Sequence, residues 1–305
     1  MTATAPHWRR ALGRALSQCA RATVAQSLAT DIGFAGTAER IGITGPPGAG
    51  KSSLIARLGA YWAEQGKVGV LAIDPTSPVS GGALLGDRIR MEEAGENPDL
   101  FIRSLSSGSA HDGLCPNILA LLDIFDQQHF TRVILETVGV GQVSYEARPL
   151  VDTFLVVLVP DSGDSIQAMK AGIMEMADIY IINKDDLPAA ARLEKELQAV
   201  LKLRPSSQPW TPPVIMASAK YGRGTEDIAE AITRHRAMTF TPAHKAALIA
   251  QRRAYHLRSL FARAVAEVMA ASQSQIADLR AADAYAYLVE NLERLEKDQG
   301  LGLIR

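Results

Sequence analysis

The stretch Gly45-Pro46-Pro47-Gly48-Ala49-Gly50-Lys51-Ser52 decides how this chain folds, because it fits the pattern G-x-x-x-x-G-K-[S/T]. It follows the apolar run Arg40–Thr44 and precedes a helical pattern, the context that such a loop requires. Its glycines let successive backbone N–H groups turn inward around phosphate oxygens, and the next helix presents its positive N-terminal end there. The stretch therefore predicts a phosphate-binding loop (P-loop) between a strand and a helix.

Each residue type in this loop has an expected role. Lys51 is expected to reach the β- and γ-phosphates and to act in catalysis, and the Ser52 hydroxyl to bind Mg²⁺. An ordinary glycine-rich turn would have no use for this lysine and serine. The nucleotide-binding residues predicted in the loop are Gly45, Gly48, Ala49, Gly50, Lys51, Ser52 and Ser53.

Short β-rich runs alternate with helical stretches through most of the chain, which is typical of βα units in a parallel sheet. The predicted strands are Arg40–Thr44, Val68–Ile73, Leu100–Leu105, Arg132–Glu136, Thr153–Pro160, Ile179–Asn183 and Val214–Ser218. The expected fold class is α/β: a P-loop NTPase with a mainly parallel sheet flanked by helices, an N-terminal helix and a C-terminal helical arm. We expect an N-terminal helical extension over 1–38, a P-loop domain over 39–238 and the helical arm over 239–305.

The base of the nucleotide is indicated by Asn183-Lys184-Asp185-Asp186, which has the form N-K-x-D at the end of an apolar strand. Asp186 could accept hydrogen bonds from the ring N–H and exocyclic amine of guanine. Adenine has no donor at those positions and would leave the carboxylate without a partner. Ser218-Ala219-Lys220 follows the last predicted strand and is expected to lie over the guanine carbonyl. The expected nucleotides are therefore GTP and GDP.

Three carboxylates are candidates for the metal site. Asp74 and Glu136 end predicted strands, and Asp87 lies in a glycine-rich segment. Carboxylates at the carboxyl ends of strands face the ligand crevice of a parallel sheet. Because Mg²⁺ keeps several water and phosphate oxygens, some of these residues would act through water. We expect the metal residues to be Ser52, Asp74, Asp87 and Glu136, with Glu136 also catalytic.

Composition excludes several classes of function. Hydrophobic residues make up 47% of the 305 residues and charged residues 21%, as in ordinary globular domains. A formal charge of −1 and the lack of basic runs interleaved with aromatics argue against nucleic acid as a partner. No apolar stretch approaches the roughly 20 residues of a membrane span. Cys19 and Cys115 have no metal-ligand spacing and are interpreted as small buried residues of a cytoplasmic protein.

Both ends of the chain leave alternatives open. Arg9, Arg10, Arg14 and Arg21 precede the first acidic residue, Asp31, as in a mitochondrial presequence, but a basic amphipathic helix packed on the core is the favoured interpretation. In the helical tail, apolar residues recur at three- and four-residue steps, so one stripe must be covered by the core or by a second subunit. This stripe comprises Leu257, Leu260, Phe261, Ala264, Val265 and Val268.

The P-loop is followed by Asp74–Pro78, Gly81–Arg88, Glu136–Gln142 and Asn183–Asp186, and this ordered set of motifs resembles one family. The chain is similar to the methylmalonyl-CoA mutase-associated GTPases of the MeaB or ArgK type, also labelled LAO/AO transport ATPases. The resemblance covers motifs over roughly residues 10 to 238. It implies a GTP-hydrolysing chaperone that gates cofactor loading and protection of an adenosylcobalamin-dependent acyl-CoA mutase.

The resemblance also assigns roles to single residues and to the tail. Asp74, Asp87 and Glu136 would serve Mg²⁺ and the switch regions. Asp161–Lys170 would form a third switch loop in which Lys170 couples the mutase to GTP hydrolysis. The helical tail would be the arm of a homodimer.

One segment departs from the family pattern. Ser109–Pro116, which contains His111, stands where the family commonly has small residues, so a mutase acting on isobutyryl-CoA or 2-hydroxyisobutyryl-CoA is an alternative client. Outside the family, the rivals are a nickel-insertion GTPase, a P-loop kinase linked to amino-acid transport, and a non-enzymatic interaction module. A nickel chaperone should carry a His-rich tract or a Cys/His pair near the P-loop, and the sequence has neither.

Overall fold

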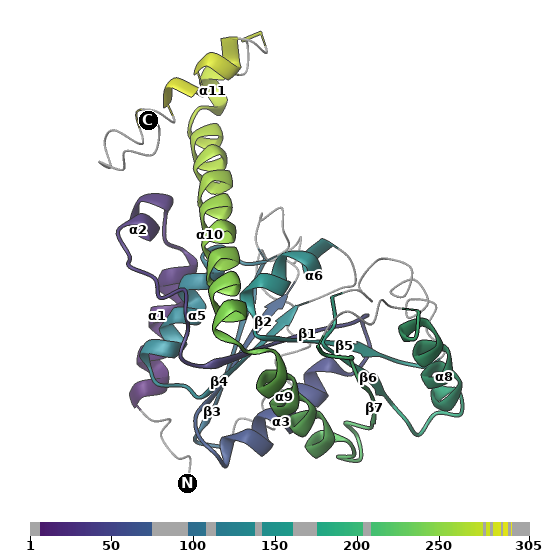
Figure 1. Cartoon of the computed structure of the whole chain (residues 1–305). Helices are drawn as coiled ribbons and strands as arrows, with labels where there is room; N and C mark the ends of the chain where they lie inside the picture. The colour runs from purple at the N-terminus through teal and green to yellow at the C-terminus, as the bar shows by residue number, and fades with distance from the viewer. Residues whose placement is uncertain are drawn as a thin grey trace.

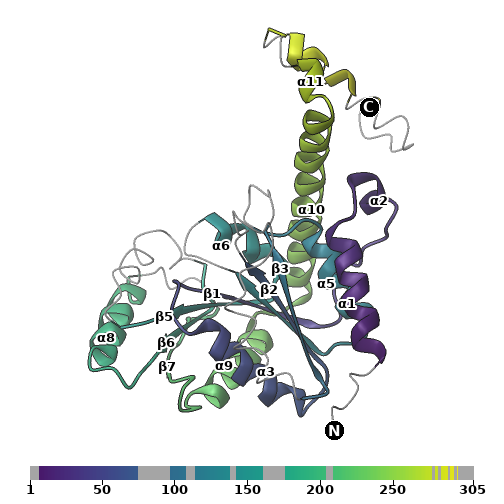
Figure 2. The same cartoon turned by 180° about the vertical axis from the view of Figure 1, so that it is seen from behind.

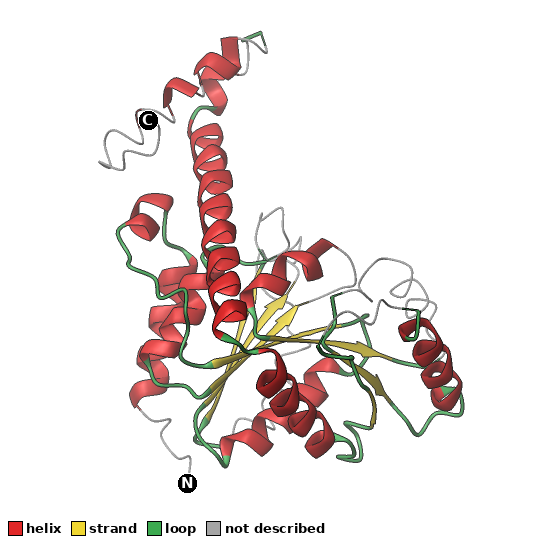
Figure 3. Ribbon diagram, viewed as in Figure 1, coloured by secondary structure: helices red, strands yellow, loops and turns green. Residues whose placement is uncertain are grey.

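The computed structural model of the chain describes residues 7–74, 97–107, 114–137, 142–160, 176–203, 209–276, 279–280, 283–287, 289–291 and 294. Within these residues lies a sheet of seven strands in the order β3-β2-β4-β1-β5-β6-β7. Its strands are drawn in yellow, with helices in red around them, in Figure 3. Its strands are β1 Glu39–Thr44, β2 Val68–Asp74, β3 Leu100–Ser106, β4 Arg132–Thr137, β5 Thr153–Leu158, β6 Ile179–Asn183 and β7 Val214–Ala217.

Every pair of neighbouring strands in this sheet is parallel. Strands β1, β2, β5 and β6 are buried along their whole length, as expected where helices cover both faces. The predicted strands and the α/β P-loop fold class are confirmed. The boundaries differ slightly: β5 ends at Leu158 rather than Pro160, where proline cannot donate to a strand ladder.

Helices fill most of the connections between the strands. Those described are α1 His7–Ala20, α2 Val24–Leu28, α3 Lys51–Ala63, α5 Ile118–Gln127, α6 Gln142–Ala147, the 3₁₀ turn η1 Arg148–Leu150, α8 Ala190–Leu201, α9 Thr225–Thr239, α10 Pro242–Ala271 and α11 Gln273–Ile276. Helices α3 and α9 cover one face of the sheet, and α1 and α5 lie on the other (Figures 1 and 2). None of the described helices has the length and hydropathy that crossing a bilayer requires.

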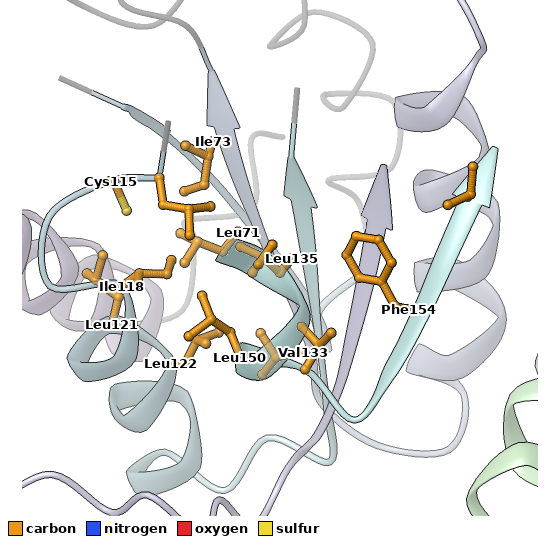
Figure 4. Packing of buried hydrophobic residues seen from close by; sticks show 14 of the residues in the cluster. Leu71, Ile73, Cys115, Ile118, Leu121, Leu122, Val133, Leu135, Leu150 and Phe154 are labelled. Carbon is orange, nitrogen blue, oxygen red and sulfur yellow. The ribbon is translucent and has the colours of Figure 1, made fainter. Parts of the chain in front are cut away.

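The core on the α5 side forms because apolar side chains of alternate strand positions meet the apolar face of that helix. Figure 4 shows Leu71 and Leu135 of the sheet opposite Ile118, Leu121 and Leu122 of α5. All five are at most 1% exposed. Burying a side chain of this size stabilises the fold by about 1.5–3 kcal/mol, so this layer holds the sheet against its helices.

Helix α1 packs on the same layer, as the amphipathic-helix interpretation predicted. Leu12 and Leu16 are at most 2% exposed, and the Trp8 ring lies 6.1 Å from Phe101 and 6.0 Å from Phe130 between centroids. The Arg9 guanidinium donates to the carbonyls of Asn97 (2.5 Å) and Leu100 (2.7 Å), at the start of β3. Arg9, Arg10 and Arg14 therefore lie on a helix that is tied to the edge strand β3, and Arg21 follows the end of that helix.

Helix α10 begins on the core and rises well beyond it (Figures 1 and 2). Thr241 caps its first turn by accepting a hydrogen bond from His244 N, and Pro242 occupies the first position, where no N–H is needed. The predicted apolar stripe divides on this helix. Leu260, Ala264 and Val268 are buried, the first two against Val24 of α2, whereas Leu257 is 52% and Phe261 65% exposed. Folding back onto the core is thus confirmed for only part of the stripe.

A buried ionic network ties the base of α10 to the sheet. Arg252, 1% exposed, donates to the carbonyls of Phe34 and Ala35 and to the Asp152 carboxylate at 2.7 Å. The second Asp152 oxygen accepts Arg40 N at 2.9 Å. Burial lowers the pKa of Arg252 and the nearby Arg40 charge adds to this, while Asp152 opposes it. Because the pKa of a guanidinium is far above neutrality, Arg252 stays charged and needs these acceptors.

The Arg40 side chain extends the same network to α5. Its Nη2 donates to Asp126 Oδ2 at 2.6 Å. The other Asp126 oxygen accepts the backbone N–H groups of Thr37 and Ala38 at 2.9 and 2.7 Å. The segment that leads into β1 is therefore held by charge-assisted hydrogen bonds from two sides.

Replacing Arg252 with methionine should destabilise the chain strongly. The variant Arg252→Met leaves the Asp152 carboxylate buried without its ion-pair partner, which costs about 3–5 kcal/mol. Urea unfolding followed by circular dichroism should show the midpoint falling accordingly, while Lys245→Met, at an exposed position on the same helix, should leave it within experimental scatter. Equal midpoints for the two variants would contradict this account of how the arm is held.

Candidate nucleotide-binding site

The predicted site residues that the structure describes follow the carboxyl ends of five strands. The P-loop follows β1, Asp74 ends β2, Glu136 is the penultimate residue of β4, Asn183 ends β6, and Ser218 comes directly after β7. Since all strands are parallel, these ends lie at one edge of the sheet, where open α/β folds bind their ligands. The topology thus gathers residues that are far apart in the sequence.

Two glycines of the P-loop are required by close packing. A Cβ at Gly45 would lie closer to the Val157 carbonyl oxygen of β5 than atoms can approach, and a Cβ at Gly50 would clash with the Asn183 amide. Gly50 also has φ +83° at the N-cap of α3, a conformation that favours glycine. The backbone of the P-loop therefore packs closely against β5 and β6, and it leads directly into the N-terminus of α3.

Lys51 is the first residue of α3 and is only 7% exposed. Its ammonium donates to the carbonyl oxygens of Gly45 (2.8 Å) and Pro46 (3.1 Å). These contacts hold the positive charge of Lys51 at the P-loop, where the ammonium could also donate to the oxygens of a bound phosphate. The role of Lys51 at the β- and γ-phosphates stays a prediction.

Ser52 and Glu136 meet across the site. The Ser52 hydroxyl donates to Glu136 Oε1 at 3.1 Å, and Glu136 is 5% exposed. Strands β2 and β4 pair Ile73 with Thr137, so Asp74, which is 3% exposed, lies one position further along the neighbouring strand. One hydroxyl and two carboxylates at this edge form an oxygen donor set that fits Mg²⁺.

Within the described residues, no group of three His, Cys, Asp or Glu side chains gathers as an all-protein metal site would need. A cation held by Ser52, Glu136 and Asp74 would complete its shell with phosphate oxygens and water, as Mg²⁺ does at nucleotides. The donor set therefore fits a nucleotide-bound magnesium ion better than a structural metal.

Asn183 joins the P-loop to the loop that follows β7. Its Nδ2 donates to the Ala49 carbonyl at 2.7 Å, and its Oδ1 accepts Ala219 N at 3.0 Å. The side chain is 2% exposed, so both hydrogen bonds are shielded from water. One amide thus holds the P-loop and the loop after β7 at a set separation.

The base-binding loops are also tied to each other. The Ser218 hydroxyl donates to Asp186 Oδ1 at 3.1 Å and so orients the carboxylate predicted to bind guanine. Asp185 N donates to the Ala217 carbonyl at 3.0 Å. Lys184 adopts φ +61°, which turns the chain sharply between Asn183 and the two aspartates. Lys220 lies in the loop after β7 with its ammonium 5.0 Å from the Tyr221 ring centroid.

Two arginines that the sequence did not single out support these loops. Arg57 Nε on α3 donates to the Ala219 carbonyl at 3.2 Å, and Arg223 forms an ion pair with Asp185. The hydrogen bond that Arg223 donates to the Asp185 carboxylate raises the pKa of Arg223. No local motif marks either residue; Arg57 is recognisable only once α3 is known to pass beneath the loop after β7.

Several predicted residues lie outside the described part of the chain. They are Asp87, Lys170 and the rest of the Asp161–Lys170 segment, together with His111 and Gly139. Gln142 opens α6, but its side chain is also outside the description. The roles expected for these residues remain predictions.

Comparison with known proteins identifies matches over most of the chain. The family described as "Methylmalonyl Co-A mutase-associated GTPase MeaB" matches residues 10–274. A Pyrococcus horikoshii protein is 38% identical over 248 residues, covering 80% of this chain and 78% of its own. The GTPase ArgK of Escherichia coli is 38% identical over 205 residues, covering 65% of this chain and 62% of its own.

Two further matches come from a mammal and from a solved structure. The mitochondrial methylmalonic aciduria type A homolog of Mus musculus is 39% identical over 194 residues, 62% of this chain and 47% of its own. A crystal structure of an LAO/AO transport system kinase superposes with a TM-score of 0.63 at 25% identity, covering 93% of each chain. The chain thus spans less than two thirds of the Escherichia coli and mouse proteins.

The two hydrogen bonds of the Asn183 side chain provide a test of the site. Asn183→Ala removes both hydrogen bonds and leaves buried polar groups without partners, which costs about 1–3 kcal/mol each. GDP affinity measured by calorimetry should fall about tenfold or more. Asn183→Asp keeps the acceptor for Ala219 N but places a carboxylate oxygen against the Ala49 carbonyl in a buried position, so GDP affinity should fall in this variant as well. Unchanged affinity in both variants would show that these hydrogen bonds do not support nucleotide binding.

Proposed function

The chain belongs to the MeaB family of methylmalonyl-CoA mutase-associated GTPases, and we propose that it hydrolyses GTP as a chaperone of an adenosylcobalamin-dependent acyl-CoA mutase. Family membership confirms the resemblance read from the motifs. The observation that carries the nucleotide-binding part of the proposal is the Asn183 amide, which joins the base motif to the P-loop at Ala49. A glycine-rich turn with only a structural role would not need a hydrogen bond to the base motif.

Guanine selectivity follows from the loops around Asp186. Ser218 donates to one oxygen of this carboxylate, which leaves the other free to turn toward the ring N–H and amine of a guanine. An adenine in the same place would leave a carboxylate without a donor, at a cost of about 1–3 kcal/mol. Lys220 and Ala219 would lie over the guanine carbonyl, as their place after β7 suggests.

We propose that the reaction is in-line attack of water on the γ-phosphate. The Lys51 ammonium and the N–H groups around Gly48 and Gly50 stabilise the negative charge that develops on the phosphate oxygens. Ser52, Glu136 and Asp74 would hold Mg²⁺, which supplies charge neutralisation at the β- and γ-phosphates. No residue is assigned to orient the water, since Gln142 lies three positions beyond Gly139.

The client enters the proposal through the family, whose description names methylmalonyl-CoA mutase. We propose a methylmalonyl-CoA mutase or a relative acting on isobutyryl-CoA or 2-hydroxyisobutyryl-CoA. GTP hydrolysis would be slow in the isolated protein and faster when the mutase orders the switch segments. Asp87 would serve Mg²⁺ and a switch region, and Lys170 would couple the mutase to hydrolysis.

The proposal is tested by GTP turnover with and without a purified adenosylcobalamin-dependent acyl-CoA mutase. Hydrolysis should be slow for the chain alone, rise about tenfold or more with the mutase because a partner completes the site, and vanish in Lys51→Ala. ATP in place of GTP should be a poor substrate in both conditions.

Four outcomes would count against the proposal. Fast hydrolysis that no mutase changes would remove the switch role. A clear preference for ATP would favour the P-loop kinase linked to amino-acid transport. Unimpaired nucleotide binding by Lys51→Ala would favour a non-enzymatic module, and activation by a nickel-site apoprotein in place of a mutase would favour the metallochaperone.

We also propose that α10 is the arm of a homodimer, with residues 1–38 as an N-terminal extension, 39–238 as the GTPase domain and 239–305 as the arm. Leu257, Phe261, Val265 and Met269 recur at four-residue steps and so share one side of α10. Leu257, Phe261 and Met269 are 52%, 65% and 46% exposed. An apolar row of this kind on a helix that projects from the core fits a second copy of the chain.

A charge in the middle of this row should separate the dimer. Phe261→Glu places a carboxylate at the proposed interface, where an unpaired charge is costly, yet the residue is exposed in one chain and its loss should change monomer stability by about 0.5 kcal/mol or less. Light scattering after size exclusion should give a dimer for the wild type and for Gln251→Glu, and a monomer for Phe261→Glu. Equal masses for all three would refute this interface.

A further inference from the structure

Arg57 lies on α3, six residues after Lys51, on the helix that begins at the P-loop. Its Nε donates to the carbonyl oxygen of Ala219, in the loop after β7, at 3.2 Å. Ala219 is 6% exposed and belongs to the apolar cluster that Leu54 and Leu58 of α3 form with the sheet. The helix that carries the phosphate-binding lysine therefore also contacts the loop predicted to bind the base.

Ala219 is held at both of its backbone groups by side chains from other elements. Its N–H donates to Asn183 Oδ1 at 3.0 Å, and its carbonyl accepts the hydrogen bond from Arg57 Nε. The loop around it closes as a turn, since Tyr221 N donates to the Ser218 carbonyl at 3.1 Å. The end of β6 thus fixes one side of this residue, and α3 fixes the other.

The hydrogen bond from Arg57 sets the direction of the next backbone N–H group. No cis peptide bond occurs among the described residues, and in a trans peptide the C=O and the following N–H lie in one plane and point in opposite directions. Because Arg57 holds the Ala219 carbonyl on the side of α3, the Lys220 N–H points away from that helix. Lys220 is exposed, and within the part of the chain that the structure describes its N–H makes no hydrogen bond. This donor is therefore available to a ligand.

The expected partner of this N–H is the ring carbonyl oxygen O6 of guanine. Asp186, whose carboxylate accepts the Ser218 hydroxyl at 3.1 Å, is predicted to bind the ring N–H and the exocyclic amine. O6 is attached to the carbon next to that ring N–H, so it lies on the same edge of the base. Lys220 follows Ser218 by two residues, which brings its N–H to this part of the site. Adenine has an amino group in place of O6 and offers no acceptor to this donor.

We propose that Arg57 is a positioning residue for base selection, which fixes the Ala219–Lys220 peptide so that the Lys220 N–H donates to guanine O6. The inference rests on the GTPase function proposed above and adds to it a residue outside the nucleotide motifs. Arg57 does not touch the base. Its hydrogen bond keeps the peptide in the donating orientation before the nucleotide arrives, which lowers the ordering cost of binding.

A purely structural role for Arg57 predicts a different pattern of effects. A hydrogen bond that only joined α3 to the loop after β7 would support the binding of every nucleotide equally. A hydrogen bond that orients the Lys220 N–H matters only for bases that carry O6. Comparing bases with and without this oxygen therefore separates the two roles.

Competition against a fluorescent GDP measures the affinity of three diphosphates. GDP and inosine diphosphate both carry O6, whereas the diphosphate of 2-aminopurine riboside keeps the amine and lacks O6. Arg57→Met removes the donor and keeps an unbranched apolar stem. It should weaken the binding of GDP and inosine diphosphate by about three- to tenfold, as loss of one hydrogen bond does. Binding of the 2-aminopurine diphosphate should change by about twofold or less.

Two variants serve as controls. Arg57→Lys keeps a cationic donor on a flexible stem, whose ammonium can donate to the same carbonyl, and should retain most of the GDP affinity. Arg234→Met removes an exposed arginine of α9 that pairs with Glu230 of the same helix at 3.8 Å, and should leave all three affinities within about twofold. Circular dichroism of the nucleotide-free proteins verifies that each variant folds.

Two results would overturn the role of Arg57 and leave the GTPase proposal intact. One is an equal loss of affinity for all three diphosphates in Arg57→Met, which would identify a structural contact. The other is unchanged GDP affinity in that variant. Absence of GDP binding by the wild type would overturn the nucleotide site itself, and the role of Arg57 with it.

Discussion

The Asn183 side-chain amide is the interaction on which the geometry of the nucleotide site depends. It donates to the P-loop at Ala49 and accepts from the loop after β7 at Ala219, while itself ending β6. Gly50 must lack a side chain for this contact to form, because a Cβ there would clash with the amide. The glycine of one motif and the asparagine of another, more than 130 residues apart, are therefore parts of a single contact.

A second constraint lies at the amino ends of the strands, opposite the nucleotide site, and ties α10 to the core of the protein. Arg252, Asp152, Arg40 and Asp126 form a buried chain of charge-assisted hydrogen bonds from α10 through the strand starts to α5. Replacing such a network with apolar residues can be neutral, whereas breaking it is costly. We infer that the network serves mainly to hold the base of α10 in one position on the core.

Local patterns predicted the architecture and the five strand ends of the site. The P-loop, the N-K-x-D motif and the continuous apolar strands are short-range signals whose chemistry depends on neighbouring residues. What they could not predict are contacts between distant segments: Arg57 with Ala219, Arg223 with Asp185, and the Arg252 network. The local sequence around an arginine does not indicate its partner, because the partner depends on which helices and loops pack together in the folded chain.

The amino-acid sequence by itself determined the fold class, the phosphate loop and the base motif, since each rests on residue types at set spacings along one chain. Only the tertiary structure decided how the tail stripe divides between buried Leu260 and exposed Phe261, and that Arg57 of α3 holds the Ala219 carbonyl beside the predicted base site. Periodicity shows that a helix has an apolar or a charged side. Which neighbour covers that side depends on the packing of segments that the sequence keeps apart.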